Sequence, residues 1–135
     1  LTAGTSTGGM FKKRWGRIGD SPVIGAGTYA DNNSCAVSCT GHGEYFIRHA
    51  VAFDVCARYK YLKESVEKAA DYIIHTELNT NAGNGGLIAV DKLGNIAMPY
   101  NSGGMFRGFL YKEKGRPEIK KGCGIGKKIV VVGEK

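Results

Sequence analysis

Long apolar runs and paired zinc ligands are missing from this sequence of 135 residues. No run approaches the roughly 18 apolar residues of a membrane-spanning helix, so no membrane span is predicted. The four cysteines are Cys35, Cys39, Cys56 and Cys123, and no second ligand pair accompanies the first two at zinc-site spacing. Buried free thiols in a reducing compartment are therefore expected. No signal peptide is visible, and we expect a cytoplasmic protein, with a periplasmic or secreted location left open if a leader precedes this sequence.

Aromatic residues are scarce in the basic parts of the chain, although the net charge is +7. The basic residues lie mainly in Lys12–Arg17 and Lys112–Lys128, where only Phe11, Trp15 and Tyr111 interleave with them. Nucleic-acid-binding surfaces typically combine basic and aromatic side chains. The pattern favours a solvated surface, so no nucleic-acid partner is expected, and a basic nucleic-acid-binding module is the alternative.

Glycine is the residue in excess, with 21 residues, about twice its average usage of roughly 7%. The glycines follow no G-X-Y period, which excludes collagen and implies many tight turns. The length predicts one domain with a substantial core.

The hydrophobic pattern changes its period along the chain. Apolar and polar residues alternate from Cys35 to Cys39, as in a strand. No glycine or proline interrupts residues 44–61, and apolar residues recur at helical spacing in 64–78, so two successive helices are predicted.

Further strands are predicted after these helices. The segments GLIAV and IAMPY flank the turn DKLGN as a hairpin, with Gly94 where a positive φ is needed. GMFRGFLY is predicted as another strand and PEIK as an edge strand. Strands, two helices and strands again predict an α+β layered fold with an antiparallel sheet.

Two positions favour a small-molecule site. A strand that ends at Thr40-Gly41 before a helix brings backbone N–H groups and a hydroxyl to one point, which suits an anion or a developing oxyanion. The alternative is a plain turn in which Thr40 caps the helix. Arg17 and Asp20 lie on a glycine-bounded loop and can clamp the carboxylate and ammonium groups of an amino acid. Their alternative is a weak surface pair with each other.

The segment Thr5-Ser6-Thr7 precedes a Gly-Gly step. Its hydroxyl groups are either turn formers or serve a nucleophile. A Ser-His-Asp triad cannot be read from the spacing, and no phosphate-binding loop is matched.

Four long motifs, in this order, resemble one family: TSTGGM, GRIGDSPVIGAGTYAD, AVSCTGHGE and GGLIAVDKLGNIAMPYNSGGMFRG. They are similar to the β subunit of the plant-type L-asparaginases, also known as isoaspartyl (β-aspartyl) peptidases, which are N-terminal-nucleophile hydrolases. The resemblance covers residues 1–118 as a partial β subunit and leaves 119–135 as a basic C-terminal extension of unclear role. It implies antiparallel sheets in a four-layer αββα sandwich that is incomplete in this chain.

The resemblance also implies an activity and the residues that serve it. The activity is hydrolysis of the side-chain amide of L-asparagine and of β-aspartyl peptides, in which a threonine hydroxyl attacks and its own α-amine acts as base. A related amide, glycosylated asparagine, is the alternative substrate. The implied roles are nucleophile support by Thr7, head-group binding by Arg17 and Asp20, an oxyanion hole at Thr40 and Gly41, and a pocket lining at Gly43.

The nucleophile is expected outside this sequence. In the family, the β subunit opens with a threonine freed by self-cleavage, and a strand and turn separate it from the segment that resembles LTAGTSTGGM. Leu1 has no hydroxyl, and Thr2 and Thr7 have no free α-amine. We therefore expect the threonine upstream in a longer precursor and no activity from the chain alone; an inactive truncated product is the alternative.

The same resemblance implies partners. The α subunit of the same precursor is expected to complete the sheet and the pocket, in an (αβ)2 assembly. No cofactor is expected, and the monovalent cation of the family has no assignable site in these residues.

Overall fold

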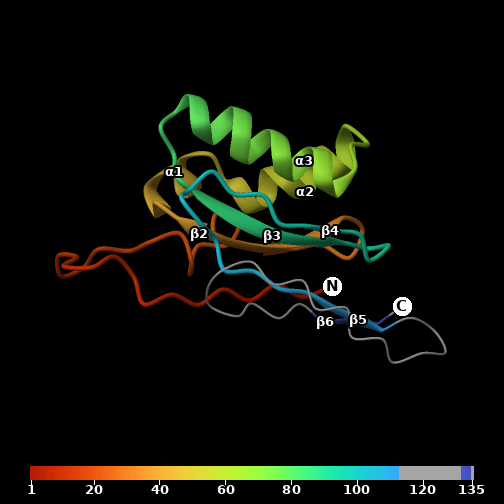
Figure 1. Cartoon of the computed structure of the whole chain (residues 1–135), viewed down its shortest axis with the longest axis horizontal. Helices are drawn as coiled ribbons and strands as arrows, with labels where there is room; N and C mark the ends of the chain where they lie inside the picture. Colours follow the sequence, from red (N-terminus) through yellow and green to blue (C-terminus); the bar gives the residue numbers. More distant parts are fainter. Residues whose placement is uncertain (113–131, 135) are drawn as a thin grey trace.

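The computed structural model describes residues 1–112 and 132–134 and shows helices packed on one face of an antiparallel sheet (Figure 1). The sheet has four strands in the order β1-β2-β3-β4. These strands are β1 (Thr28–Ala30), β2 (Cys35–Gly41), β3 (Gly85–Asp91) and β4 (Ile96–Ala97). The helices are α1 (Gly43–Arg48), α2 (Val51–Tyr61) and α3 (Val66–Tyr72), and α3 continues as the π-helix η1 (Ile73–Leu78). The architecture is thus α+β with an antiparallel sheet, as the sequence predicts.

A second, smaller sheet pairs β5 (Leu110–Lys112) with β6 (Val132–Glu134) in parallel. It lies on the side of the main sheet that faces away from the helices (Figure 1). The described residues therefore contribute one helix layer and one four-stranded sheet, and they do not by themselves make a sandwich of two packed four-stranded sheets.

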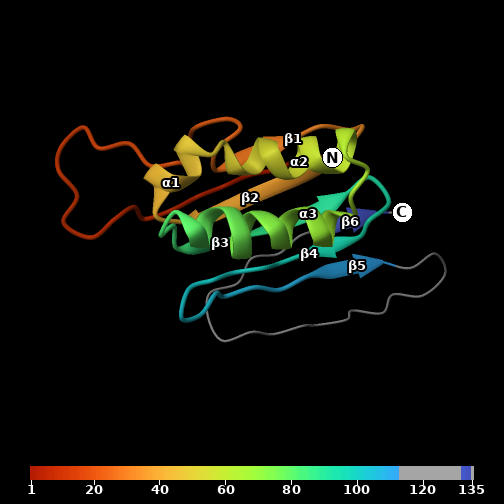
Figure 2. The same cartoon turned by 90° about the horizontal axis from the view of Figure 1, so that it is seen from above.

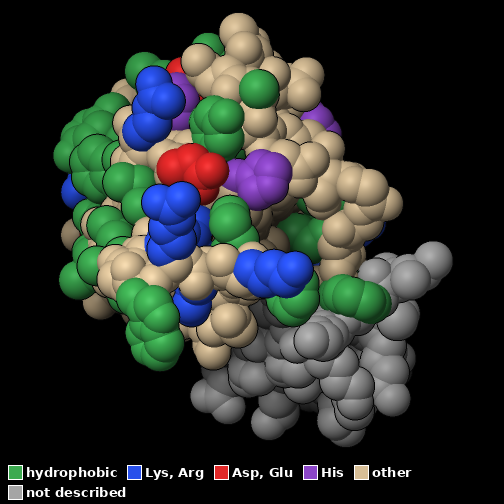
Figure 3. Space-filling view, turned by 90° about the vertical axis from the view of Figure 1, so that its left-hand side faces the viewer, with side chains coloured by type: hydrophobic (Ala, Val, Ile, Leu, Met, Phe, Trp, Pro, Cys, Tyr) green, Lys and Arg blue, Asp and Glu red, His purple; other side chains and the backbone are tan. Residues whose placement is uncertain are grey.

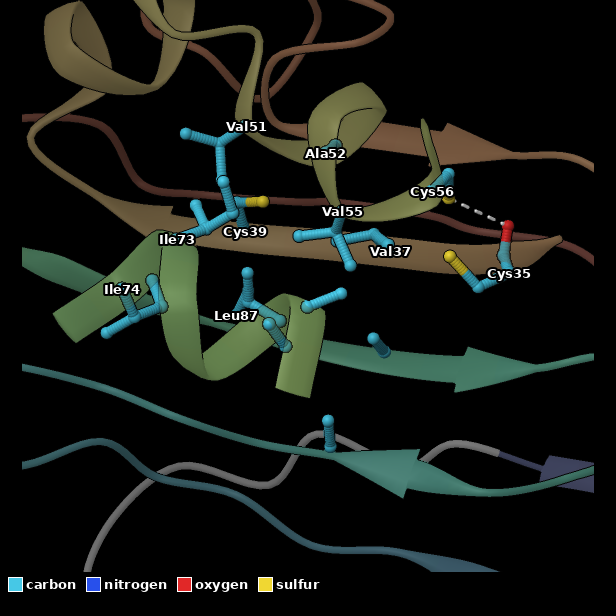
Figure 4. Packing of buried hydrophobic residues seen from close by; sticks show 14 of the residues in the cluster. Cys35, Val37, Cys39, Val51, Ala52, Val55, Cys56, Ile73, Ile74 and Leu87 are labelled. Carbon is cyan, nitrogen blue, oxygen red and sulfur yellow. Dashed lines mark hydrogen bonds between the residues drawn. The ribbon is translucent and has the colours of Figure 1, made fainter. Parts of the chain in front are cut away.

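The alternation of side chains along β2 decides which residues enter the core. Cys35, Val37 and Cys39 are buried and point toward the helices, where they pack with residues of α2 and η1 (Figure 4). Leu87, on β3, joins the same cluster. The predicted strand over 35–39 is confirmed, and β2 continues it through Thr40 and Gly41.

The predicted single helix over 44–61 is wrong, because the chain breaks at Ala50. This residue has φ 45° and ψ 47°, a left-handed conformation that costs a residue with a Cβ roughly 1–2 kcal/mol. The break allows the first amides of α2 to bond outside the helix. The Ala52 N–H donates to the Ala26 carbonyl at 3.1 Å, and the following amide donates to the Gly25 carbonyl at 2.8 Å. The turn before β1 therefore fixes where α2 begins.

The second predicted helix, over 64–78, is confirmed in extent but not in type. α3 begins after Ser65, whose Oγ accepts a hydrogen bond from the Lys68 N–H at 3.2 Å. From Ile73 to Leu78 the helix widens to π geometry, which helical periodicity does not indicate.

The predicted hairpin is confirmed, with Ala89 opposite Ala97 and Gly94 at φ 85°. The strand predicted over 104–111 is wrong for its first part, since strand geometry begins only at Leu110. The buried Met105 of this segment packs against Gly86. The predicted edge strand PEIK lies outside the described residues.

Candidate functional site

Thr40 and Gly41 end β2, and Gly41 has a backbone conformation that glycine adopts readily. Gly41 has φ 149° and stands opposite Gly85 in the β2–β3 register. A Cβ built on Gly41 would lie 2.7 Å from the Gly85 Cα, so the two strands approach more closely than a side chain allows. Both Thr40 and Gly41 are exposed. A hydroxyl and a closely packed glycine backbone are therefore presented to solvent at one end of the sheet.

Asp20 lies beside this strand end and is only 5% exposed. Two glycines make room for its carboxylate: a Cβ on Gly43 would lie 2.8 Å from Oδ1, and a Cβ on Gly27 would lie 2.8 Å from Oδ2. Oδ2 has no hydrogen-bond partner among the described residues. A buried oxygen without a partner is costly and marks a candidate binding site.

The pKa of Asp20 also indicates a candidate binding site. Burial raises the pKa of Asp20, while backbone hydrogen bonding and the positive charge of Arg17 partly offset that effect. Burial also raises the pKa of the Cys39 thiol, and the negative charge of Asp20 adds to this rise. A ligand that brings an ammonium group would relieve the cost of the ionised carboxylate.

Arg17 forms an ion pair with Glu44, its Nη2 lying 3.4 Å from Oε2. Since Glu44 follows Gly43 directly, this contact places the guanidinium at the same end of the sheet as Asp20. The side chains are 27% and 55% exposed, and an exposed pair of this kind contributes only about 0–1 kcal/mol. A ligand carboxylate can thus replace Glu44 on Arg17 at little cost. Figure 3 looks onto this end of the molecule, where acidic, basic and histidine side chains lie side by side.

The N-terminal segment runs along the helix-free face of the sheet in the direction of β2 (Figure 1). The Leu1 amino group donates to Asn32 Oδ1 at 2.6 Å, in the turn between β1 and β2. Further along, Thr5 Oγ1 lies 2.6 Å from Ser38 Oγ and donates to the Gly27 carbonyl at 2.9 Å. Thr5 is therefore the hydroxyl of this segment that contacts the strand carrying the site.

Thr7 comes two residues later and is exposed. Its Oγ1 accepts a hydrogen bond from the Gly9 N–H at 3.0 Å, which is the geometry of a turn former. The direction of the segment carries Thr7 toward the end of β2 where Thr40 lies. The structure thus brings Arg17, Asp20 and Gly43 together beside Thr40 and Gly41, and it shows Thr7 bonded within its own turn.

Two residues of this region were missed by reasoning from the sequence. Glu44 was not singled out, although its position next to Gly43 was a signal that it would lie near any ligand of that site. Asn101 follows β4 and bonds to the loop at the start of β3, and no periodicity or motif in the sequence singles it out.

In residues 1–112 and 132–134 no group of three or more histidine, cysteine, aspartate and glutamate residues is arranged to hold a metal ion. The helices among these residues are too short or too polar to cross a membrane. Fold and site together define an α+β protein with a carboxylate and a guanidinium at one end of its sheet.

Several known proteins have sequences similar to this one. Residues 1–119 match the asparaginase family. The chain is 52% identical over 111 residues to the isoaspartyl peptidase of Salmonella typhimurium and 47% identical over 125 residues to that of Escherichia coli. It is 39% identical over 122 residues to the plant-type L-asparaginase of Pyrobaculum calidifontis. These matches cover 82%, 85% and 88% of the chain, respectively. The chain belongs to the asparaginase family, and the resemblance seen in its motifs is confirmed.

The same matches cover only part of each relative. The chain spans 36%, 39% and 40% of the lengths of these three proteins.

Proposed function

We propose that this chain supplies the substrate-binding and oxyanion-stabilising part of an enzyme that hydrolyses the side-chain amide of L-asparagine and the β-aspartyl bond of isoaspartyl peptides. The observation that carries the proposal is the buried carboxylate of Asp20, whose Oδ2 has no partner among the described residues and which lies near the charge of Arg17. An α-amino acid head group offers both complementary charges at once.

Recognition of the substrate follows from these two charges. The ammonium group bonds to Asp20, and the α-carboxylate takes the place of Glu44 on the Arg17 guanidinium. Gly43 is needed here because any larger residue would collide with the Asp20 carboxylate. With the head group fixed at two points, the side-chain amide is directed toward the end of β2.

The chemistry then needs a nucleophile and a site for negative charge. A threonine hydroxyl attacks the amide carbon, its own α-amine accepts the proton, and the oxygen that becomes negative lies against Thr40 and Gly41. The amine leaves as ammonia or as the amino group of the released residue, and the β-aspartyl ester that remains is hydrolysed by water. Thr7 supports the nucleophile from the turn next to it.

We infer that the nucleophile comes from a segment outside residues 1–135. The Leu1 amine is bound at the Asn32 turn, at the opposite end of the seven-residue strand β2, which spans roughly 20 Å. Thr5, whose hydroxyl is bonded to Ser38 and Gly27, does not offer a free hydroxyl for the attack. The α subunit of the same precursor and a second αβ copy are the proposed partners.

The helix-free face of the sheet supports this assembly. Ile88, on β3, points away from the helices by strand alternation, and Ser38 and Thr40 share that face. Covering it with a further sheet would give the αββα sandwich of an N-terminal-nucleophile hydrolase and would bring the nucleophile to the strand end.

Ammonia release tests the function. The full-length protein that carries this sequence is expected to release ammonia from L-asparagine and aspartate from a β-aspartyl dipeptide, whereas the isolated 135-residue chain is expected to release neither. Glycosylated asparagine, assayed in parallel, identifies the alternative substrate. Absence of amide hydrolysis by the full-length protein with all three substrates would contradict the proposal.

Replacement of Arg17 tests the binding mode. Arg17→Ala removes a charge-assisted contact worth roughly 1.5–3 kcal/mol, so KM is expected to rise about 10- to 150-fold with a smaller change in kcat. Arg58→Ala is the matched control. Arg58 lies on α2, and its Nε is 2.9 Å from Glu64 Oε2, so this variant should leave KM unchanged. Equal affinity of wild type and Arg17→Ala for aspartate would remove Arg17 from the site.

A further inference from the structure

We propose that Asn101 is a positioning residue that holds the Thr40–Gly41 strand end in its working geometry, acting through the loop Gly83–Gly85. The inference rests on the proposed function, because it concerns the same oxyanion-stabilising strand end. It starts from a side chain whose amide protons and oxygen all have partners on the backbone of that region.

The side chain of Asn101 makes three hydrogen bonds. Nδ2 donates to the Gly83 carbonyl at 2.8 Å and to the Ile74 carbonyl at 3.2 Å. Oδ1 accepts from the Gly85 N–H at 2.8 Å. The Asn101 backbone N–H also donates to the Gly85 carbonyl at 2.9 Å. Three of these four bonds fix both ends of the Gly83–Gly85 loop, and the fourth reaches Ile74.

The opposite side of this loop contacts the candidate oxyanion strand. The His42 N–H donates to the Asn84 carbonyl at 2.9 Å. Gly85 stands opposite Gly41 in the register, in the close approach that excludes a Cβ. The loop therefore lies between Asn101 and Gly41, and a shift of the loop moves the strand end. Donors to an oxyanion have to lie about 2.7–3.1 Å from it, so small shifts matter.

The bond to Ile74 anchors this arrangement in the core. Ile74 lies in η1, and its side chain is fully buried. π-Helical turns are rare and occur frequently at functional sites. Here the carbonyl of a π-helical residue accepts the Asn101 amide, so the strand end is tied through one side chain to the helix that packs on the sheet.

Asp91 provides a matched comparison within the same strand. Asp91 is the last residue of β3, at the opposite end of the strand from Gly85, and it is buried. Its Oδ1 accepts from the Leu93 and Asn95 N–H groups, each at 2.8 Å, and its Oδ2 accepts from Asn95 Nδ2 at 2.8 Å. The two side chains fix loops in the same way, but roughly 20 Å of strand separates Asp91 from the site.

Amide hydrogen exchange tests the coupling without reference to activity. In the full-length protein, Asn101→Asp removes both amide donors, and Asn101→Ala removes the side chain's bonds without placing a carboxylate against two carbonyls. In both variants we expect exchange in a peptide covering residues 38–46 to rise about tenfold or more. Asp91→Asn should raise exchange in residues 89–97 only. If the peptide 38–46 exchanges at the wild-type rate in both Asn101 variants, or equally fast in Asp91→Asn, the proposal is overturned.

Kinetics then separate positioning from general loss of stability. At a temperature where all variants are folded, the Asn101 variants are expected to lower kcat about 10- to 100-fold with KM changed by less than about threefold. Asp91→Asn should change neither constant. Wild-type kcat in both Asn101 variants would overturn the positioning role. If the wild-type protein hydrolyses no amide, the proposed function fails, and the exchange measurement still decides the structural coupling.

Discussion

The two ends of the four-stranded sheet handle buried and half-buried polar groups in opposite ways. At the end that carries the β1–β2 turn, Asp31 Oδ1 accepts from the Asn33 N–H at 2.8 Å and Oδ2 accepts from Lys60 Nζ at 3.0 Å. These bonds lower the pKa of Asp31. Leu1 is bound at the same turn (Figure 2). This end of the sheet is built for stability, because the carboxylates of Asp31 and Asp91 are hydrogen-bonded at both oxygens.

At the other end, the carboxylate of Asp20 is buried with one oxygen unpartnered, and its pKa is raised. Glycine occurs where a side chain would collide, at Gly27, Gly41 and Gly43. Unsatisfied polar groups and close backbone approaches reduce stability, and proteins retain them where a ligand compensates. The difference between the two ends therefore supports the proposed substrate site at the end that carries Asp20.

The largest effect is expected at Gly41. Gly41→Ala forces a Cβ against the Asn84 carbonyl and to within 2.7 Å of the Gly85 Cα, at a φ of 149°. The strand end has to shift, which would misplace the proposed oxyanion donors, so we expect kcat to fall about 10²- to 10³-fold. Steady-state kinetics of the full-length protein provide the measurement.

Gly94→Ala is the control for this prediction. Gly94 also has a positive φ, 85°, but lies in the turn between β3 and β4 at the stable end of the sheet. Its replacement should lower the free energy of unfolding by roughly 1 kcal/mol and leave kcat unchanged. Equal losses of kcat in the two alanine variants would break the comparison between the ends.

The sequence was sufficient to predict the helices and strands that local interactions stabilise. The alternation in β2, the hairpin around Gly94 and the extent of α3 with η1 follow from periodicity and turn chemistry. Arg17 and Asp20 were predicted from the sequence as a head-group clamp; the structure places both residues at one end of the sheet, and their role in binding stays a prediction.

The remaining features depend on contacts between distant segments. The break at Ala50 exists because α2 donates to carbonyls of the Gly25–Gly27 turn, and the helical pattern does not contain that turn. Arg17 pairs with Glu44, 27 positions away, instead of with its neighbour Asp20. Asn101 bonds to backbone groups of two other segments, the Gly83–Gly85 loop and η1, so its proposed role cannot be read without coordinates.

Asp20→Asn should weaken substrate binding while it stabilises the fold. The amide retains the shape of the carboxylate but offers no negative charge to an ammonium group, so KM is expected to rise by about 10- to 150-fold. Because burial raises the pKa of Asp20, the ionised wild-type side chain destabilises the folded state, and the variant should unfold at a higher temperature at neutral pH. A variant that lost stability and kept its KM would show that Asp20 is an ordinary structural residue.

The direction of the Asp20 pKa shift predicts how the free energy of unfolding changes with pH. The pKa of Asp20 is raised from its ordinary value of 3.8, so the folded state keeps a proton over a range where the unfolded chain has lost it. The free energy of unfolding of the wild type therefore falls as the pH rises through that range. The advantage of Asp20→Asn should be absent below the ordinary value and complete above the raised one. Thermal unfolding from about pH 3 to pH 7 measures it.

Asp31→Asn should give the smallest effect and the opposite sign. Hydrogen bonds from the Asn33 N–H and from Lys60 lower the pKa of Asp31, so its contribution to stability is present above the ordinary value of 3.8 and is lost as the pH falls through the lowered one. The variant should unfold at a slightly lower temperature than the wild type at neutral pH, converge with it in acid, and keep both kinetic constants. Thermal unfolding of Asp20→Asn and Asp31→Asn over the same pH series tests the contrast directly. Two curves that deviate from the wild type in the same direction would mean that the two ends of the sheet do not divide stability and binding between them.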